Sequence, residues 1–517
     1  MRVLRILLVM IVGLVAAVSL WSWAQRPGRV LYVGGPILTM DASNRVVDAL
    51  ALDGARIAAV GNESELRAWA EQNGATVVDL AGRALLPGFI DAHGHFPGEG
   101  IYAVHVDLNS PPIGDVESID DLLARLGERA AETPDGEWII GMGYDDTLLG
   151  EQRHPTRHDL DRASTRHPIG VLHISGHLAA VNTAALAKLE YDADTPDPEG
   201  GVIRREPGSR RPDGVLEETA SNPLQPLLSP GGAGALAVFR SASDRYARAG
   251  VTTAQSGLTP RLLITILSWA SRLGVIPLRM VIWSEPAAAE AILSGEFEPP
   301  ESDYVRSGAV KLLADGSIQG YTGYLGLPYY VPPGDDPGYR GYPRIPRDEL
   351  IETVERFHGA GLQVAVHGNG DAAIDDILDA FESAQRKHPR EDARHVVIHA
   401  QMARDDQLDR MRSLGLIPSF FSLHTFYWGD RHRTIFMGPE RAARMSPAGG
   451  AVERQLRFTL HADSPVVPME PLRLVWAAVN RRTRSGFELG PEQRISPMQA
   501  LRAVTIDAAW QHFEEDV

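Results

Sequence analysis

The sequence predicts an α/β protein whose main domain is a (β/α)₈ barrel of the TIM type, with an insertion after the first strand and a small, incomplete β domain. Three observations lead to this fold class. Short apolar runs alternate with amphipathic stretches of helical length, as expected for strands buried on both faces of a parallel sheet. Eight such runs can be counted along the 517 residues. Side chains able to bind a metal stand at the ends of several runs, where the active sites of such barrels lie.

The first 24 residues predict a secretory signal peptide. Arg2 and Arg5 precede an apolar run over residues 6–20, and the small residues Ser22 and Ala24 mark a cleavage site after position 24. An uncleaved N-terminal anchor is the alternative, because the run is nearly long enough to span a bilayer. Both readings place the rest of the chain outside the cytoplasm, periplasmic or secreted, and limit any membrane attachment to this segment.

Residues 25–84 predict the N-terminal part of a small β domain. Strands are expected at residues 30–33, 49–60 and 77–80, with turns at the glycines of residues 34–35 and at residues 53–54. The apolar run over residues 84–89 is expected to lead into the first barrel strand, which ends at Asp91.

The barrel domain is predicted over residues 85–512. After the first strand, its strands are expected at residues 251–254, 278–283, 309–313, 363–367, 395–399, 416–420 and 458–461, with helices such as residues 347–360 and 371–387 between them. A doubly wound open sheet is the alternative, and it ranks lower because no Gly-rich phosphate loop follows an early strand.

A stretch of about residues 96–242 is too long to be an ordinary connection between a strand and a helix. We therefore predict an inserted subdomain with strands of its own at residues 138–141 and 169–174. Its Pro-, Asp-, Gly- and Arg-rich part, residues 195–214, predicts an exposed loop. Near the end of the chain, residues 496–513 predict one helix that begins with a Ser-Pro cap.

Composition excludes several classes of function. The formal net charge of −17 argues against a nucleic-acid-binding protein, which needs a basic surface. The chain has no cysteine, so disulfides, thiolate nucleophiles and Cys-ligated zinc are excluded. Any metal ligands must therefore be histidines, carboxylates or a modified lysine. A homo-oligomer is compatible with the sequence.

Five side chains at the ends of predicted strands could bind a metal. His93 and His95 are two residues apart on a strand and so point the same way, although one His-x-His is expected by chance about half the time with this histidine content. His367 and His399 end their strands, and Asp463 follows the last strand. Lys311 lies inside an apolar strand, which is costly unless the amine is paired or altered. For each residue alone a core role is the alternative, whereas coincidence poorly explains all of them together.

Other polar residues are weaker candidates. His177 follows a strand of the predicted insertion, and His424, Tyr427 and Trp428 follow the seventh barrel strand, so these four could contact a substrate or could be structural. Asp315 is interpreted as a turn residue. We expect surface exposure, in Arg-rich surroundings, at His154, His158 and His167.

Residues 86–95, which read LPGFIDAHGH, resemble the first metal-binding strand of the amidohydrolase superfamily. The segments that begin at Ser175, Lys311, His367 and His461 look like those of its YtcJ-like branch, which includes N-substituted formamide deformylases. The resemblance extends from about residue 30 to the end of the chain, and its first and last motifs are the most specific.

This resemblance implies a centre with one or two divalent metal ions, most often zinc, although Mn, Fe and Ni also suit such ligands. His93, His95 and Asp463 would hold one ion, and His367 and His399 the second. Lys311, carboxylated by CO₂, would bridge the two ions, which turns a buried ammonium into an anionic oxygen donor.

The activity implied is hydrolysis of a carbon–nitrogen bond other than a peptide bond in a small-molecule amide or formamide. Hydroxide formed from metal-bound water would attack the carbonyl, and Asp463 would act as general base and then general acid. The alternatives are a deaminase, an esterase or lactonase on the same scaffold, or an exported binding or regulatory protein without turnover.

We also expect the chain to be a fragment. Two or three short strands rarely stand alone, because they leave an unpaired edge and bury little apolar area. In the family that the sequence resembles, strands that follow the barrel complete the small domain. Here the chain stops at Val517, before any such strand.

Overall fold

The computed structural model describes residues 28–228, 231–300 and 302–517, so the predicted signal peptide lies outside the described residues. The chain divides into two units, residues 1–88 and residues 89–517. Among the described helices, none is long and apolar enough to cross a membrane.

The first unit contains a four-stranded sheet in the order β5-β4-β1-β6. Its strands are β1 (Arg29–Val33), β4 (Ala49–Asp53), β5 (Arg56–Gly61) and β6 (Thr76–Asp79), and a two-stranded ribbon comprises β2 (Ile37–Leu38) and β3 (Val46–Val47). Helix α2 (Glu63–Asn73) buries Leu66 and Ala70 together with Leu31 and Ala51 of the sheet. Alternation of buried and exposed residues along β1 and β4 gives the sheet one apolar face, which α2 covers.

The second unit contains an eight-stranded parallel sheet in the order β7-β14-β15-β16-β17-β18-β19-β20. Its strands are β7 (Phe89–Ile90), β14 (Val251–Thr259), β15 (Arg279–Ser284), β16 (Val305–Leu313), β17 (Val364–Gly368), β18 (Val396–His399), β19 (Ile417–Phe420) and β20 (Thr459–Leu460). The prediction of eight parallel strands at these places in the chain is confirmed. Beyond β7 and β20 the chain continues the pairing, because Asp463 N–H donates to His93 O and His95 N–H donates to Ser464 O. The sheet is therefore curled, with its first and last strands side by side.

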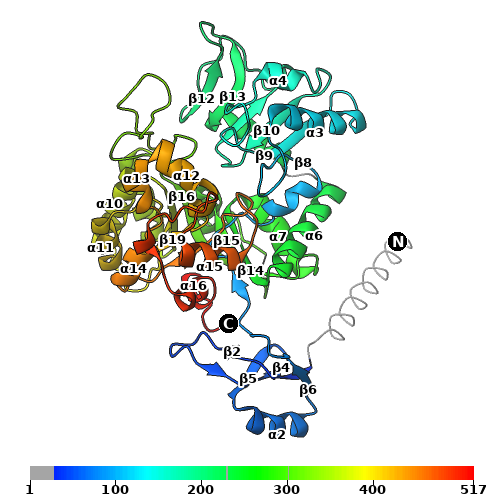
Figure 1. Cartoon of the computed structure of the whole chain (residues 1–517), viewed down its shortest axis with the longest axis vertical. Coiled ribbons are helices and arrows are strands. Elements are labelled where there is room, and N and C mark those ends of the chain that lie inside the picture. The colour runs from blue at the N-terminus through cyan, green and yellow to red at the C-terminus, as the bar shows by residue number, and fades with distance from the viewer. Residues whose placement is uncertain (1–27, 229–230, 301) are drawn as a thin grey trace. The chain divides into compact units, whose positions relative to one another are not determined.

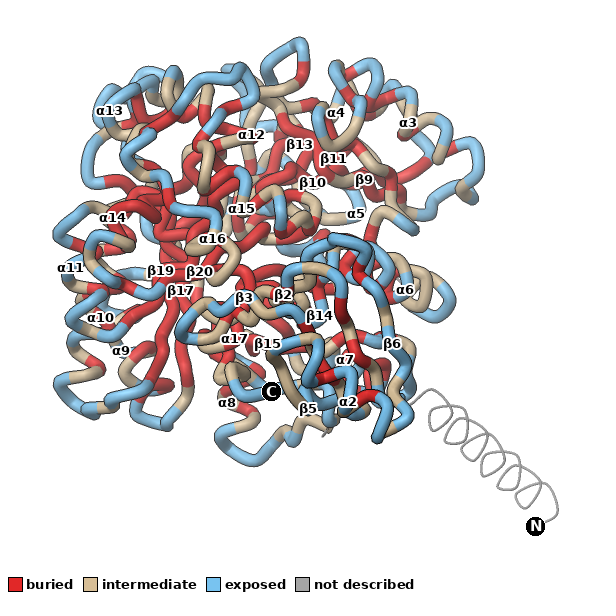
Figure 2. Tube along the Cα trace, turned by 60° about the horizontal axis from the view of Figure 1, so that its bottom comes forward, coloured by how far each residue is buried: buried red, intermediate tan, exposed pale blue. Residues whose placement is uncertain are grey.

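Helices follow most of these strands and cover the outside of the curled sheet (Figure 1). They are α6 (Gly232–Arg248), α7 (Arg261–Arg272), α8 (Pro286–Leu293), α9 (Arg347–Gly359), α10 (Asp371–Lys387) and α11 (Asp405–Ser413). Figure 2 shows the strands β17, β19 and β20 buried along their length, whereas α9 to α11 each have an exposed side. Helix α10 buries Ile374, Ile377 and Phe381 at helical spacing against the sheet, so burial of one apolar face positions it.

Between β7 and β14 the chain forms a separate six-stranded sheet in the order β12-β13-β11-β10-β9-β8. Its strands are β8 (Val106–Asp107), β9 (Ile139–Tyr144), β10 (Ile169–His173), β11 (Leu178–Val181), β12 (Gly201–Arg205) and β13 (Pro212–Glu218), and its helices include α3 (Ile119–Glu132), α4 (Arg157–Asp161) and α5 (Thr183–Lys188). The strands predicted at residues 138–141 and 169–174 correspond to β9 and β10.

Two local predictions are wrong. Residues 195–214 are not one exposed loop, because β12 and the start of β13 lie there and pair antiparallel around residues 206–211. The predicted helix over residues 496–513 is two helices, α16 (Pro497–Ala503) and α17 (Ile506–Gln511), since Thr505 has a non-helical backbone with φ −132° and ψ −102°. Four further helices, α12 (His424–Arg431), α13 (Gly438–Ala443), α14 (Ala448–Glu453) and α15 (Pro471–Asn480), lie after β19 and β20.

Candidate metal centre

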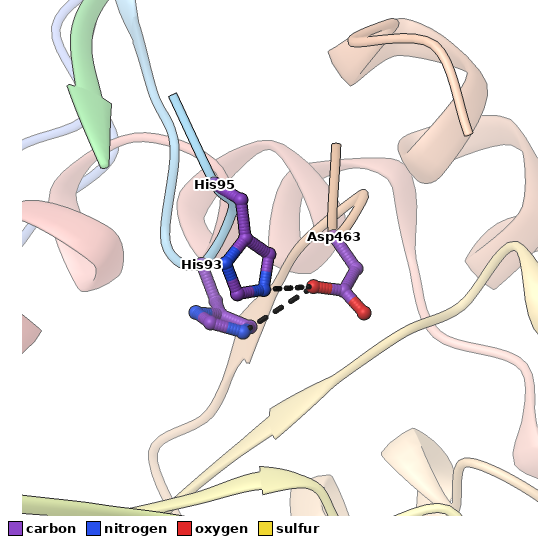
Figure 3. A group of neighbouring side chains, drawn as sticks. All are labelled: His93, His95 and Asp463. Carbon is purple, nitrogen blue, oxygen red and sulfur yellow. Dashed lines mark ion pairs between the residues drawn. The ribbon is translucent and has the colours of Figure 1, made fainter. Parts of the chain in front are cut away.

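His93, His95 and Asp463 meet at the carboxyl end of the curled sheet, as the resemblance implies (Figure 3). The two histidines follow β7, and Asp463 follows β20, which lies beside β7 in space. Asp463 Oδ1 is 3.3 Å from the Nε2 atoms of both histidines. The His93 side chain is fully buried, whereas the His95 side chain is 38% exposed, so the group can be reached from solvent on one side.

The hydrogen bonds behind the two histidines fix their tautomers. His93 Nδ1 lies 3.1 Å from Gln255 Oε1, an oxygen that also accepts the backbone N–H of Gly94 and is therefore an acceptor. His95 Nδ1 lies 3.1 Å from the carbonyl oxygen of Gly257. Both Nδ1 atoms must donate, which leaves both Nε2 atoms without a proton in the neutral rings.

Three atoms that can only accept hydrogen bonds therefore face one another. Burial lowers the pKa of His93 to about 3, which keeps this ring neutral. Asp463 Oδ1 is buried and has no hydrogen-bond donor among the described residues. Two imidazole nitrogens and one carboxylate oxygen in this arrangement fit a divalent cation.

Lys311 lies in β16 beside this group. Its Nζ atom is 3.1 Å from His93 Nε2, and its side chain is among the largest that are fully buried. Burial lowers the pKa of Lys311 to about 7, against an opposing effect of the Asp463 charge. The amine thus lies at the Nε2 edge of the His93 ring, which is stacked on Trp283 at a centroid distance of 5.3 Å.

His367 and His399 belong to a second chain of histidines, at the ends of β17 and β18. His399 Nε2 is 3.1 Å from His367 Nδ1, His461 Nε2 is 3.1 Å from His399 Nδ1, and His367 Nε2 is 3.1 Å from the carbonyl oxygen of Gly316. His399 Nε2 is also 3.9 Å from Asp463 Oδ2. The predicted residues are therefore brought together. Both ring nitrogens of His367 and His399 have hydrogen-bond partners, whereas His95 Nε2 has none among the described residues and His93 Nε2 has only the Lys311 amine.

His461 is a buried member of this group that the sequence did not single out. Its signal was its place directly after the last strand, two residues before Asp463. Backbone strain also marks the site, because His399 and Asp463 have φ angles of 66° and 53°. Such left-handed geometry costs about 1–3 kcal/mol in a residue other than glycine and persists where surrounding packing enforces it.

His177 lies at the rim of the centre, ahead of β11, with its ring centroid 5.7 Å from that of His367. Its Nδ1 is 2.9 Å from Oε2 of Glu218, a carboxylate absent from the predicted site. His424 and Trp428 lie in α12. His424 is buried with its ring 6.2 Å from that of His399, whereas the indole N–H of Trp428 already donates to Asp145.

Asp315 acts as a turn residue, as interpreted from the sequence. Its carboxylate accepts the backbone N–H groups of Tyr324, Asn369 and Gly370. Burial raises the pKa of Asp315 to about 7, and the three backbone hydrogen bonds offset part of this effect. The carboxylate fixes the turn that carries His367.

A second cluster of metal-capable residues, Asp145, Asp146 and His173, lies in the six-stranded sheet. Arg431 donates to both carboxylate oxygens of Asp145, and Thr147 and Trp428 also donate to it. Because the charge and lone pairs of Asp145 are already satisfied, we interpret this cluster as a charge-paired network that joins β9 to α12.

The predicted exposure of three histidines is correct only for His158, whose side chain is 64% exposed. His167 is fully buried, because its ring bonds to Ser164 Oγ and to the carbonyl oxygen of Thr133. His154 is largely buried against Tyr144 beside a cavity of about 360 Å³, and burial lowers its pKa to about 4. The surrounding arginines misled the sequence interpretation, since Arg153, Arg162 and Arg166 pair with acidic residues.

Comparisons with known proteins show which family the chain resembles. A family model described as "Amidohydrolase family" matches residues 76–517. The chain is 27% identical over 501 residues to an N-substituted formamide deformylase of Arthrobacter pascens, covering 93% of this chain and 89% of that one. It is 28% identical over 511 residues to the putative amidohydrolase YtcJ of Bacillus subtilis (strain 168), covering 93% and 90%. A crystal structure of an uncharacterized metal-dependent hydrolase from Pyrococcus furiosus superposes with a TM-score of 0.72 at 26% identity, covering 94% of this chain and 95% of that one.

Proposed function

The chain belongs to the amidohydrolase family, and on that premise we propose that this metal-dependent hydrolase cleaves the carbon–nitrogen bond of a small-molecule amide or formamide. The observation that carries the proposal is the convergence of three acceptor atoms, the Nε2 atoms of His93 and His95 and Oδ1 of Asp463. Lone pairs that face one another at this distance repel, and a bound cation removes the repulsion.

The proposed ligand set starts with these three residues. Lys311 Nζ and His399 Nε2 lie close enough to join it, at 3.1 Å from His93 Nε2 and 3.9 Å from Asp463 Oδ2. We propose that Lys311 is carboxylated, because an anionic oxygen donor suits a buried position next to a cation better than an ammonium does. His367 is proposed as a ligand of a second ion, for which it would have to give up its hydrogen bond to Gly316.

A divalent ion held by His93, His95 and Asp463 would activate water for attack on the carbonyl group near neutral pH. Asp463 accepts the proton of the attacking water and later passes it to the leaving nitrogen as general acid. Gln255 and the carbonyl group of Gly257 hold His93 and His95 in the tautomer that keeps their Nε2 atoms free of protons. Gly257 itself must remain glycine, because a Cβ there would lie 2.9 Å from His93 Cε1.

An amide or formamide substrate is supported by the relative named N-substituted formamide deformylase, at 27% identity. The decisive experiment is a panel of N-acyl amines, N-substituted formamides, aminopyrimidines, esters and lactones, assayed with metal-loaded and chelator-treated protein. Release of an amine and a carboxylate from the amides or formamides alone would support the proposal. Turnover confined to aminopyrimidines or esters would instead assign a deaminase or an esterase, and no turnover by metal-loaded protein would favour a binding protein.

We further propose that the protein is exported, on the basis of the predicted signal peptide alone. N-terminal sequencing of protein secreted by an expressing host tests this proposal. A mature terminus at or near Gln25 is expected, and an intact Met1 in the membrane fraction would favour the anchor.

A further inference from the structure

A polar cavity of about 360 Å³ lies in the inserted region. Strands β10 to β13 of the six-stranded sheet contribute to its walls, and the loop after β16 contributes residues 319–321. None of the residues that line the cavity is a proposed ligand of the metal centre. Pockets that bind small molecules have volumes of about 300–1,000 Å³. The cavity is therefore large enough for a small organic ligand.

Two arginines line the cavity, but their charges are already paired. Arg153 donates to both carboxylate oxygens of Asp159, at 2.7 and 3.0 Å, and Arg204 Nε donates to Glu217 Oε1. Since an ion pair has no net charge, these arginines do not offset the other acidic groups of the cavity. An anionic ligand would have to compete with Asp159 and Glu217 for them.

Asp146 lines the same cavity and has no cationic partner. The ion pair between its neighbour Asp145 and α12 does not include it. Asp146 Oδ1 is 3.1 Å from His173 Nε2, and its Oδ2 is 3.6 Å from His154 Nε2. The backbone N–H of Ser175 donates to His173 Nδ1, so this nitrogen carries no proton and the ring is neutral. Burial lowers the pKa of His154 to about 4, which keeps this ring neutral as well.

Asp213 and Gln319 add two further acceptors to the cavity. Asp213 Oδ1 accepts a backbone N–H group two residues further along β13, and among the described residues no lysine or arginine forms an ion pair with it. Gln319 is 7% exposed, and its Oε1 is buried without a hydrogen-bond partner among the described residues. A buried acceptor without a donor is costly, and a ligand that donates removes the cost. Leu178 and Val215 give the cavity an apolar wall beside these oxygens.

We infer that this cavity binds an organic ammonium ion, with Asp146 and Asp213 balancing its charge and Gln319 Oε1 accepting one of its N–H groups. An alkylammonium ion carries one positive charge, three donors and an apolar stem, which suits acceptors placed beside an apolar wall. Divalent metal ions such as Mg²⁺ and Ca²⁺ are surrounded by oxygen ligands, so the apolar wall favours the organic ion.

The inference goes beyond the proposed function and does not depend on it. Hydrolysis of an N-alkyl amide releases an amine, which is protonated at neutral pH because the pKa of an alkylamine is about 10. The metal centre, acting as proposed, would therefore release ligands of the class that the cavity is expected to bind.

Isothermal titration calorimetry of the metal-loaded protein with butylammonium chloride tests the inference. The neutral and anionic probes are 1-butanol and butyrate, and we expect only butylammonium to bind. Asp146→Asn and Asp213→Asn should each weaken its binding by at least about tenfold, as expected for a lost hydrogen bond to a charged group. Asp194→Asn is the matched control, because it removes one charge at a side chain that is 87% exposed and outside the cavity. Failure of butylammonium to bind at millimolar concentration, equal affinity for 1-butanol, or preferred binding of butyrate would overturn the inference.

Gln319→Met separates a ligand-binding role from a structural one. The substitution keeps the length of the side chain and removes the acceptor. Because Gln319 Oε1 has no partner within the described residues, the ligand-free variant should melt no lower than wild type, yet it should bind butylammonium about tenfold more weakly. This variant also tests the inference if the carboxylate variants do not fold. Wild-type affinity in Gln319→Met would contradict the inference.

Two controls show where the ligand binds and which cation it is. An amine can also coordinate a bound metal ion, so the titration is repeated with His93→Ala, for which wild-type affinity is expected. Loss of binding in His93→Ala would place the amine at the metal centre and refute the inference. Mg²⁺ and Ca²⁺ are titrated into the same variant, and binding that excludes butylammonium and is lost on Asp146→Asn would assign a metal site instead. Failure of the whole amide panel would refute the proposed function and leave these titrations intact.

Discussion

Two groups of buried histidines lie at opposite ends of the curled sheet. They differ in whether every ring nitrogen has a hydrogen-bond partner. At the amino end of the sheet, His395 precedes β18 and His358 lies in α9. His358 Nδ1 and His395 Nε2 are 2.7 Å apart, His358 Nε2 is 2.6 Å from the carbonyl oxygen of His388, and His395 Nδ1 accepts the backbone N–H of Val364. Each protonated ring nitrogen of this pair therefore has an acceptor, and each unprotonated one has a donor, while both rings are neutral.

At the carboxyl end, His93, His95 and Asp463 cannot be satisfied in that way. The Nδ1 protons of both rings are committed to Gln255 and Gly257. Of the three remaining acceptor atoms, His93 Nε2 faces the amine of Lys311 at 3.1 Å, whereas His95 Nε2 and Asp463 Oδ1 have no donor among the described residues. Burial does not distinguish the two groups, because His93 and His395 are both at most 1% exposed. The two groups are distinguished instead by where their hydrogen-bond donors point. The two groups therefore differ in whether acceptor atoms are left facing one another without a donor, as His95 Nε2 and Asp463 Oδ1 are.

Removing an acceptor from the carboxyl-end group should have the largest effect. Asp463→Asn and His93→Ala should each lower kcat/KM about a thousandfold or more and reduce bound metal, because ligands and the proton acceptor are lost together. Activity on the best amide of the panel and metal content by mass spectrometry are the measurements. Wild-type activity after exhaustive chelation would contradict the proposed mechanism.

Lys311→Ala should come next in size. We expect loss of metal and a fall in kcat of about a hundredfold, because the proposed anionic ligand is gone. Added short carboxylic acids should restore part of the activity by filling the space of the missing group. Lys311→Met is the matched control, since it keeps most of the apolar stem and excludes the acid. Equal activity with and without added acid, in a Lys311→Ala variant that retains its metal, would remove Lys311 from the ligand set.

Much of the fold was predictable because the barrel strands are buried on both faces. Runs such as residues 363–367 and 395–399 stand out as apolar whatever their neighbours are, and they match β17 and β18 within one residue. The hairpin of β12 and β13 was missed because its residues are rich in Gly, Pro, Asp and Arg. Its strand character depends on pairing with β11 rather than on its own composition.

The candidate site, too, was predictable only where the residues follow strands. His93, His95 and Asp463 were predicted because each directly follows a strand, and strand ends meet in space. Glu218 could not be predicted as the partner of His177, because the two residues meet across neighbouring strands and are 41 residues apart in the chain. The tautomers of His93 and His95 were also out of reach, since Gln255 and Gly257 fix them across 162 residues.

Disrupting the amino-end pair should affect stability and not catalysis. His395→Ala leaves His358 Nδ1 and the Val364 N–H without partners and opens a space beside Phe381, which stacks on the ring at 4.8 Å. We expect the free energy of unfolding to fall by about 2–4 kcal/mol, measured by urea denaturation, with kcat and metal content within about twofold of wild type. His399→Ala, on the other end of the same strand, is the comparison and should lower kcat. A large loss of kcat in folded His395→Ala would show that the two ends are not separate.

The smallest effect that we expect is on the pH dependence of stability. Burial lowers the pKa of His395 well below its usual value, and it also lowers that of His358. In the unfolded chain both rings titrate near their ordinary pKa of about 6.5. The unfolded state therefore binds more protons as the pH falls below about 6.5, and the stability present above that pH is lost progressively as the pH falls further.

Replacing both rings by glutamine, which cannot take up a proton, should lower the melting temperature at pH 7.5 but make it less sensitive to pH between 6.5 and 5. The buried histidines of the metal centre keep their own acid sensitivity in both proteins, so the difference between the two curves isolates the amino-end pair. Parallel curves for wild type and the double variant would mean that the pair remains neutral in the unfolded ensemble, or is protonated without cost in the folded one. The contrast between the two ends of the sheet would then rest on the metal centre alone.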